Sequence, residues 1–332
     1  MKVFRRSLAS LALFFGLGAP LVIGGQVHEI DPAKVVGSQK CGECHKYEVE
    51  AWKTTPHFAT FDSMHRSADG QKIAAALGIR RIKSESLCLT CHYTVQKKGG
   101  GEAEPISGVS CESCHGAAQD WVNVHNDKKL SREERRAKSE PAGMIRPDDL
   151  YAVAANCYQC HLVPNEKLVN VGGHTAGSKG FELVSWSQGM VRHNFLTPEG
   201  EEGKVNKEDD ANRRRMMFAI GTILDLEYSL RGVASATEKA TYGITMAQRV
   251  AGLKKRIEEI QKAAPTDEMA QIITTVSGVA LKLNNQGPLT EAADKVAELG
   301  KKFSSTETGG KLAGLDPMIP SPAQYRGKPY QP

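Results

Sequence analysis

The chain contains Cys41-Gly42-Glu43-Cys44-His45 and repeats the pattern Cys-x-x-Cys-His three more times before residue 162. The other copies are Cys88-Leu89-Thr90-Cys91-His92, Cys111-Glu112-Ser113-Cys114-His115 and Cys157-Tyr158-Gln159-Cys160-His161. Together the copies use all eight cysteines of the chain. The pattern is the attachment signature of c-type haem, in which both cysteines form thioethers and the histidine binds the iron. The sequence therefore predicts four covalently bound haems.

Other uses of cysteine fit this pattern less well. Disulfide frameworks belong mainly to small secreted domains and would not require a histidine after every second cysteine. A zinc ribbon needs four ligands per ion and leaves the histidines unexplained. Iron–sulfur clusters usually draw their cysteines from a tight run or a plant-type spacing. Haem attachment is thus the interpretation that accounts for every motif.

Residues 1–25 are expected to be a secretory signal peptide. Basic residues at positions 2, 5 and 6 precede an apolar stretch over about residues 8–23, and Gly24-Gly25 follows. The alternative is an uncleaved anchor in the inner membrane, although glycine and proline interrupt this short apolar stretch. Export also fits thioether attachment, which takes place outside the cytoplasm. We expect a periplasmic or otherwise exported protein with no stable membrane span after cleavage.

The charge does not indicate nucleic acid as a partner. The formal net charge is +5, and removal of residues 1–25 takes away three basic residues, leaving 40 basic against 38 acidic ones. Basic clusters at 128–129, 132–136 and 213–215 are interpreted as solvated faces or as partners of haem propionates. Redox proteins remain the expected partners.

The chain divides into two regions of different composition. Every cysteine lies between residues 41 and 160 and every histidine lies at or before His193, while a polar, glycine-rich stretch spans residues 197–204. We expect a mainly α fold: a multihaem cytochrome c domain of little regular structure over residues 26–204, wrapped around the four haems, and then a helical bundle. Because the first region has few apolar side chains, it should not fold without haem.

Residues 205–308 show helical periodicity. Apolar residues recur every three or four positions over about 208–231, 246–260, 269–283 and 289–303, and short breaks separate them. Short loops predict antiparallel neighbours, hence a four-helix bundle, which is also a possible oligomer contact. Its methionines are more often core residues than haem ligands. Residues 309–332 carry five prolines and are expected to form an extended tail.

Six histidines lie outside the motifs: His28, His57, His65, His125, His174 and His193. His28 follows the expected cleavage site closely and is taken to be exposed. His125 lies ten residues after His115, and in a helix that separation would be about 15 Å. Two ligands of one iron lie much closer, so His125 should serve the haem of another motif. The same reasoning applies to His57 after His45.

The order, spacing and flanking residues of the motifs resemble the cytochrome c-554 family, which comprises tetrahaem electron carriers. The resemblance covers roughly residues 36–195 and rests on Lys40–His45, Ala51–His57 and Gly108–Gly116 followed by His125. It implies that His125 completes the iron of His45, that His57 completes that of His161, and that a late histidine completes that of His115. His193 is the better match for this last role and His174 is its rival. In the family, the second haem is five-coordinate.

This sequence departs from the family pattern by having surplus histidines. His65 or the second late histidine could complete the iron held by His92, or could be a surface or propionate-binding residue.

The leading functional prediction is a tetrahaem electron carrier between redox partner proteins. One alternative is an enzyme that acts on a small nitrogen compound, such as nitric oxide, nitrite or hydroxylamine, at an open haem. Another is a subunit of a larger multihaem complex or filament.

Overall fold

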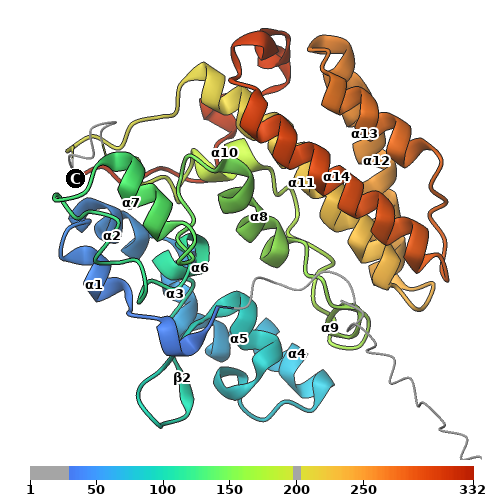
Figure 1. The fold of residues 1–332 in the computed structure, drawn as a ribbon. Coiled ribbons are helices and arrows are strands. Elements are labelled where there is room, and N and C mark those ends of the chain that lie inside the picture. The colour runs from blue at the N-terminus through green and yellow to red at the C-terminus, as the bar shows by residue number, and fades with distance from the viewer. Residues whose placement is uncertain (1–29, 197–202) are drawn as a thin grey trace, which may run out of the picture.

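The computed structural model describes residues 30–196 and 203–332, and within them the chain is mainly helical, as predicted (Figure 1). The expected signal peptide and His28 lie outside the described residues. The N-terminal region consists of short helices: α1 (Ser38–Gly42), α2 (Lys46–Lys53), α3 (Pro56–Ser63), α4 (Ala68–Leu77), α5 (Ser86–His92), α6 (Cys111–His115), α7 (Arg132–Ser139), α8 (Leu150–His161), α9 (Glu166–Asn170) and α10 (Leu183–Ser187). Single turns of 3-10 helix lie at Pro32–Lys34, Met64–Arg66 and Ile82–Ser84.

The Cys-x-x-Cys-His motifs lie on or beside helices. The second, third and fourth motifs end α5, α6 and α8, each of which stops at the motif histidine. The first motif spans the junction of α1 and α2, where the His45 amide still donates to the Cys41 carbonyl at 2.9 Å. Each histidine therefore lies one helical turn after the first cysteine of its motif.

One β-hairpin interrupts the helices. Strand β1 (Thr94–Lys97) pairs antiparallel with β2 (Ala103–Ser107), and the glycine run at 99–101 joins them. These strands were not predicted from the sequence. Thr94 is buried beside the third motif, where its hydroxyl donates to Gly108 O at 2.9 Å.

The four expected C-terminal helices are present: α11 (Ala211–Ser235), α12 (Thr241–Ala263), α13 (Asp267–Ser277) and α14 (Gln286–Thr306). Helix α11 packs against α12 and α14, and α13 packs against the same two helices, which closes a four-helix arrangement (Figure 1). The predicted break between the second and third of these helices is present at residues 264–266, and Thr266 caps α13 by accepting from the Met269 amide at 3.3 Å. Helix α13 ends at Ser277, before the predicted limit of Leu283.

The main hydrophobic core is continuous across the expected boundary near residue 205. It runs from Leu150 on α8 through α11, where Ile220 and Leu224 are fully buried, to Leu315 beyond α14. A second, small cluster around Ile82 and Tyr93 is the other apolar core within the described residues. Most apolar burial is thus in and beside the C-terminal helices, and the region around the first three motifs has little.

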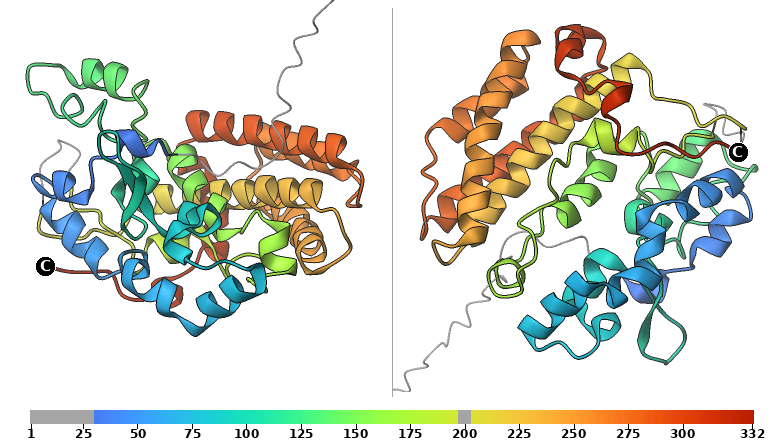
Figure 2. Two further views of the ribbon diagram at one scale, coloured as in Figure 1. Left: turned by 90° about the horizontal axis from the view of Figure 1, so that it is seen from below. Right: turned by 180° about the vertical axis from the view of Figure 1, so that it is seen from behind.

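The proline-rich C-terminal segment is more structured than the expected extended tail. It begins with a 3-10 helix, Gly310–Met318, in which Leu312 and Leu315 are buried, and a second 3-10 turn lies at Pro322–Gln324. The last residues then cross the molecule to the N-terminal helices, where the Tyr330 ring lies 6.4 Å from that of Phe195 (Figure 2). Over residues 30–196 and 203–332, no helix has both the length and the apolar character to cross a membrane.

Candidate haem-binding site

Each motif histidine faces one histidine from elsewhere in the chain. The ring centroids are 6.2 Å apart for His45 and His125, 6.1 Å for His161 and His57, 6.4 Å for His92 and His174, and 6.4 Å for His115 and His193. The spacing is thus nearly constant, whereas the angle between ring planes ranges from 25° to 83°. A constant separation is what two ligands of one metal ion require, and any angle between the ring planes is compatible with it.

The separation fits a single metal ion between the rings. A metal–imidazole bond is about 2.0–2.1 Å long and the ring centre lies about 1.1 Å beyond the nitrogen, so two rings on opposite sides of one metal have centres about 6.3 Å apart. Among the described residues no group of three or more His, Cys, Asp or Glu side chains could hold a metal ion. A metal between these pairs would therefore need further ligands, which a porphyrin would supply.

The structure also brings the late histidines to particular partners. His193, rather than its rival His174, faces His115, and His174 faces His92. His65, on the 3-10 turn Met64–Arg66, makes no ring contact with a motif histidine within the described chain. Its buried Nδ1 has no hydrogen-bond partner there.

Hydrogen bonds at Nδ1 orient several of these rings. Nδ1 lies 2.9 Å from Ile145 O in His115, 2.8 Å from Val122 O in His125, 2.9 Å from Thr175 O in His174 and 2.8 Å from Val191 O in His193. Because a carbonyl oxygen can only accept, Nδ1 carries the proton in each case. The lone pair is then on Nε2, which is the nitrogen left free to bind a metal.

Burial keeps three of the motif imidazoles neutral, those of His92, His115 and His161. It lowers the pKa of His92, His115 and His161 to about 4, and it also lowers the pKa of His57 and His125. Only a neutral imidazole offers a lone pair to a metal. These side chains are therefore in the ligand-competent form at neutral pH.

All eight cysteines are unpaired, and thiols of different motifs lie close together. Cys41 interacts with Cys111, and Cys91 interacts with Cys160. The third and fourth motifs are joined by the Asn156 side chain, whose amide donates to Cys114 O at 2.8 Å. The spatial order of the motifs is therefore first, third, fourth, second.

Two buried donors near the histidine pairs have no partner within the described residues. Trp121 Nε1 is buried while its ring stands edge-on to His125 at 5.3 Å, and Arg192, directly before His193, has an unpaired Nε. A buried donor without an acceptor costs about 1–3 kcal/mol. Haem carries two propionate carboxylates that could accept from such groups, so these donors also fit a bound haem.

Sequence reasoning missed Glu112, which lies inside the third motif and is 1% exposed. Its carboxylate accepts from the backbone amides of Val36 at 2.9 Å, Gly37 at 2.7 Å and Ala118 at 2.8 Å. It ties the segment before the first motif to the third motif. A glutamate between two motif cysteines looks like a variable surface residue, and no sequence signal marked it.

The packing around His161 was also not foreseen. Phe181 stacks on His161 at 4.4 Å with planes 2° apart, and Trp186 stands edge-on at 5.1 Å. The Nδ1 of His161 is 2.8 Å from Ser178 Oγ. All three partners lie after the last motif, so only the folded chain identifies them.

A mainly helical chain with histidine pairs set against Cys-x-x-Cys-His motifs has the features of a c-type cytochrome. Comparison with known proteins agrees: residues 40–116 match the family described as cytochrome c554 and c-prime. Cytochrome c-554 of Nitrosomonas europaea is 26% identical over 133 residues, which cover 38% of this chain and 57% of that protein. Residues 40–116 are therefore similar to the cytochrome c-554 family, which supports the resemblance that the motifs indicated.

The match is partial. The chain spans little more than half the length of the curated relative. No solved structure matches the chain. The family match ends at residue 116, so it does not include the fourth motif, the late histidines or the C-terminal helices.

Proposed function

We propose that this protein is a periplasmic tetrahaem c-type cytochrome that relays single electrons between redox partner proteins. The observation that carries the proposal is the set of four histidine pairs at 6.1–6.4 Å, each beside one cysteine pair. Each haem would be held by two thioethers and two imidazoles. The proposed axial pairs are His45–His125, His92–His174, His115–His193 and His161–His57.

The residues of the chain have separate roles in this proposal. The motif cysteines anchor the cofactor, and the buried, neutral imidazoles bind its iron through Nε2. Bound haem supplies one-electron redox chemistry. The chain would provide the histidine ligands, an apolar environment for each haem and the distances between the haems. Cys41 near Cys111 and Cys91 near Cys160 support an electron path in the order first, third, fourth, second.

The position of His174 favours relay over catalysis. An enzyme acting on nitric oxide, nitrite or hydroxylamine would need an open iron, for which the haem at His92 was the candidate. His174 faces His92 at 6.4 Å and is placed to fill that position. Periplasmic location follows from the proposed haem attachment, which takes place after export.

Intact mass and electron counting of the exported protein test the proposal. We expect the mass of the mature chain plus four haems, and we expect a reductive titration to consume four electrons per chain. A chain with fewer haems, or four haems of which one fails to exchange electrons with the others, would contradict it.

A further inference from the structure

We propose that the C-terminal region, residues 203–332, holds the two late histidines, His174 and His193, in their ligand positions through two separate clamps. This inference rests on the proposed function and assigns a role to a region that lies outside the family match. Both histidines lie in irregular segments outside the helices, so their own secondary structure does not fix them. Local hydrogen bonds orient the two rings, and the segments that carry them are held in place largely by contacts with the C-terminal region.

The first clamp joins α9 to the corner between α11 and α12. The Glu166 carboxylate accepts from the Thr237 amide at 3.0 Å and from the Thr237 hydroxyl at 2.6 Å. Asn170 Oδ1 accepts from the Tyr242 amide at 2.9 Å, and its Nδ2 donates to Glu238 at 2.8 Å. The N-terminus of α12 has no side-chain cap of its own, so Asn170 serves as one from outside the bundle.

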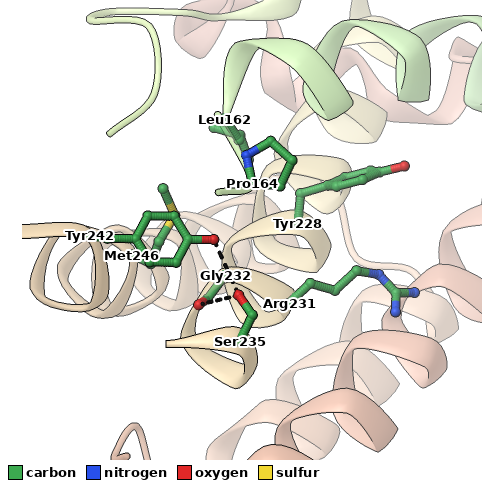
Figure 3. A pocket seen from close by; sticks show the side chains of 8 residues that line it. All are labelled: Leu162, Pro164, Tyr228, Arg231, Gly232, Ser235, Tyr242 and Met246. Carbon is green, nitrogen blue, oxygen red and sulfur yellow. Dashed lines mark hydrogen bonds between the residues drawn. The ribbon is translucent and has the colours of Figure 1, made fainter. Parts of the chain in front are cut away.

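The segment that leads to α9 packs against the same corner between α11 and α12. Figure 3 shows Leu162 and Pro164, just after His161, on one side of a small pocket whose other side includes Tyr242 and Met246. Tyr242 is fully buried, and its hydroxyl lies 3.3 Å from Ser235 Oγ. The corner is therefore a packed surface as well as a set of hydrogen bonds.

His174 follows α9 and is tied to it directly. The His174 amide donates to Leu168 O at 3.1 Å, and the Gly173 amide donates to Val169 O at 3.1 Å. Val169 is 3% exposed and belongs to the main core. A shift of α9 away from the bundle would therefore move His174 relative to His92.

The second clamp is the C-terminal strap, residues 325–332, which lies along the segment that carries His193 (Figure 2). The Arg326 amide donates to Ser185 O at 2.8 Å, and Arg326 O accepts from the Met190 amide at 2.9 Å. A Cβ atom at Gly189 would lie 2.3 Å from Arg326 O, so only glycine allows this close approach. The strap thus fixes the chain just before His193.

Asn206 fixes the residues on both sides of His193. It is 2% exposed, and its Nδ2 donates to Arg192 O and to Tyr330 O, both at 2.8 Å. Its Oδ1 accepts from the Asn194 amide at 2.9 Å. One buried amide therefore connects the strap to the residue before His193 and to the residue after it.

Electron paramagnetic resonance of the oxidised, full haem-loaded protein tests each clamp. Glu166→Ala combined with Asn170→Ala should convert part of one iron per chain to the high-spin form, with the signal that His174→Gly gives. Asn206→Ala, or a chain ending at Gln324, should give the signal of His193→Gly instead. Glu298→Ala, on the exposed face of α14, is the control and should leave the spectrum unchanged.

The outcomes separate this inference from the proposed function. Clamp variants that keep four haems and the wild-type spectrum would overturn the clamps, while the function would stand. If His174→Gly and His193→Gly themselves change nothing, the ligand assignment fails. Where a double variant does not accumulate, Glu166→Gln gives the milder form of the same test. A broad high-spin mixture from all the irons, rather than one signal for each clamp, would indicate general destabilisation and would also overturn the inference.

Discussion

The orientation of the histidine rings determines which nitrogen of each ring is available at this site. In His115, His125, His174 and His193 a backbone carbonyl accepts from Nδ1, which fixes the tautomer and directs Nε2 away from the carbonyl. Three of these carbonyls lie within three residues of their histidine, so most of this orientation is built into the local chain.

His174 gives the sharpest residue-scale prediction. His174→Gly should leave the haem at His92 with five ligands, because His174 is the histidine whose ring faces His92 and His57 faces His161 instead. Optical and magnetic spectra should show one new high-spin centre that binds nitric oxide. His65→Gly, which removes the surplus histidine, should leave the spectra unchanged. A new high-spin centre in the His65 variant would show that the pairing is wrong.

Glu112 gives a stability prediction. Its carboxylate accepts three backbone hydrogen bonds in a buried site, and Glu112→Gln replaces one oxygen by an amide donor that cannot accept. We expect a loss of about 1–3 kcal/mol in the free energy of unfolding, measured by denaturant titration of the haem-loaded protein. Glu43→Gln, inside the first motif and 60% exposed, is the matched control and should cost less than about 1 kcal/mol. Equal losses would contradict the assigned role of Glu112.

At the scale of elements, the helices pack closely where glycine permits it. A Cβ atom at Gly300 of α14 would lie 2.5 Å from Tyr151 and 2.8 Å from Ile223. Gly300→Ala should therefore lower the free energy of unfolding by about 1–3 kcal/mol. Gly252→Ala, on the exposed side of α12 with no atom within 4 Å, should raise it by about 0.5–1 kcal/mol. Thermal unfolding of both variants measures the difference, and a stabilising Gly300→Ala would refute the close contact.

An ion pair between α13 and α14 predicts a pH dependence. Lys302 lies 2.8 Å from the Glu268 carboxylate, and their hydrogen bond lowers the pKa of Glu268. A lowered carboxyl pKa contributes stability above the unfolded value of about 4.3, and this is lost as the pH falls through the folded value. Because Lys302 is 56% exposed, the contribution should be below about 1 kcal/mol.

The measurement is thermal unfolding of wild type and Glu268→Gln between neutral and acidic pH. The variant should be less stable than wild type at neutral pH, and the difference in unfolding temperature should disappear at acidic pH. A difference that grows as the pH falls would contradict the predicted direction of the pH dependence. Glu298→Gln, whose partner is on the same exposed helix face, is the control and should show a smaller gap.

Sequence predicted some elements well and others poorly, for physical reasons. Regular apolar spacing identified the C-terminal helices because α12, α13 and α14 each bury one face, whereas α11 lies at the centre and is buried on all sides over Met216–Glu227. The hairpin was missed because its strands are short and mostly polar. The predicted length of α13 was too long because Ala280 and Leu283 continue the apolar spacing after the helix has ended at Ser277. The motifs predicted the four Cys-x-x-Cys-His turns. They left open which of His174 and His193 faces His115, because both histidines lie in irregular segments whose positions depend on contacts with distant residues such as Asn206.

At the scale of the whole molecule, apolar burial is unevenly distributed. The main core extends from α8 through the C-terminal helices, while the region around the first three motifs has the small cluster at Ile82 and Tyr93. The proposed haems would supply the missing interior of that region. The C-terminal region would then serve as the stable part against which the late ligands are held.

Loss of haem should therefore unfold the molecule in part. A chain in which all motif cysteines are replaced by serine should keep amide protection in α11 to α14 and lose it in α1 to α6. Hydrogen exchange with mass spectrometry measures this. Full protection throughout the haem-free chain would contradict the dependence of the first region on its cofactor.

The most direct test of the central claim is a count of ferric spin states in the oxidised protein by electron paramagnetic resonance. Four low-spin irons per chain, with no high-spin signal and no change on adding nitric oxide to the ferric protein, are the predicted result. A stoichiometric high-spin iron in the intact protein would contradict the account, because one of the four histidine pairs would then not supply both ligands to its iron.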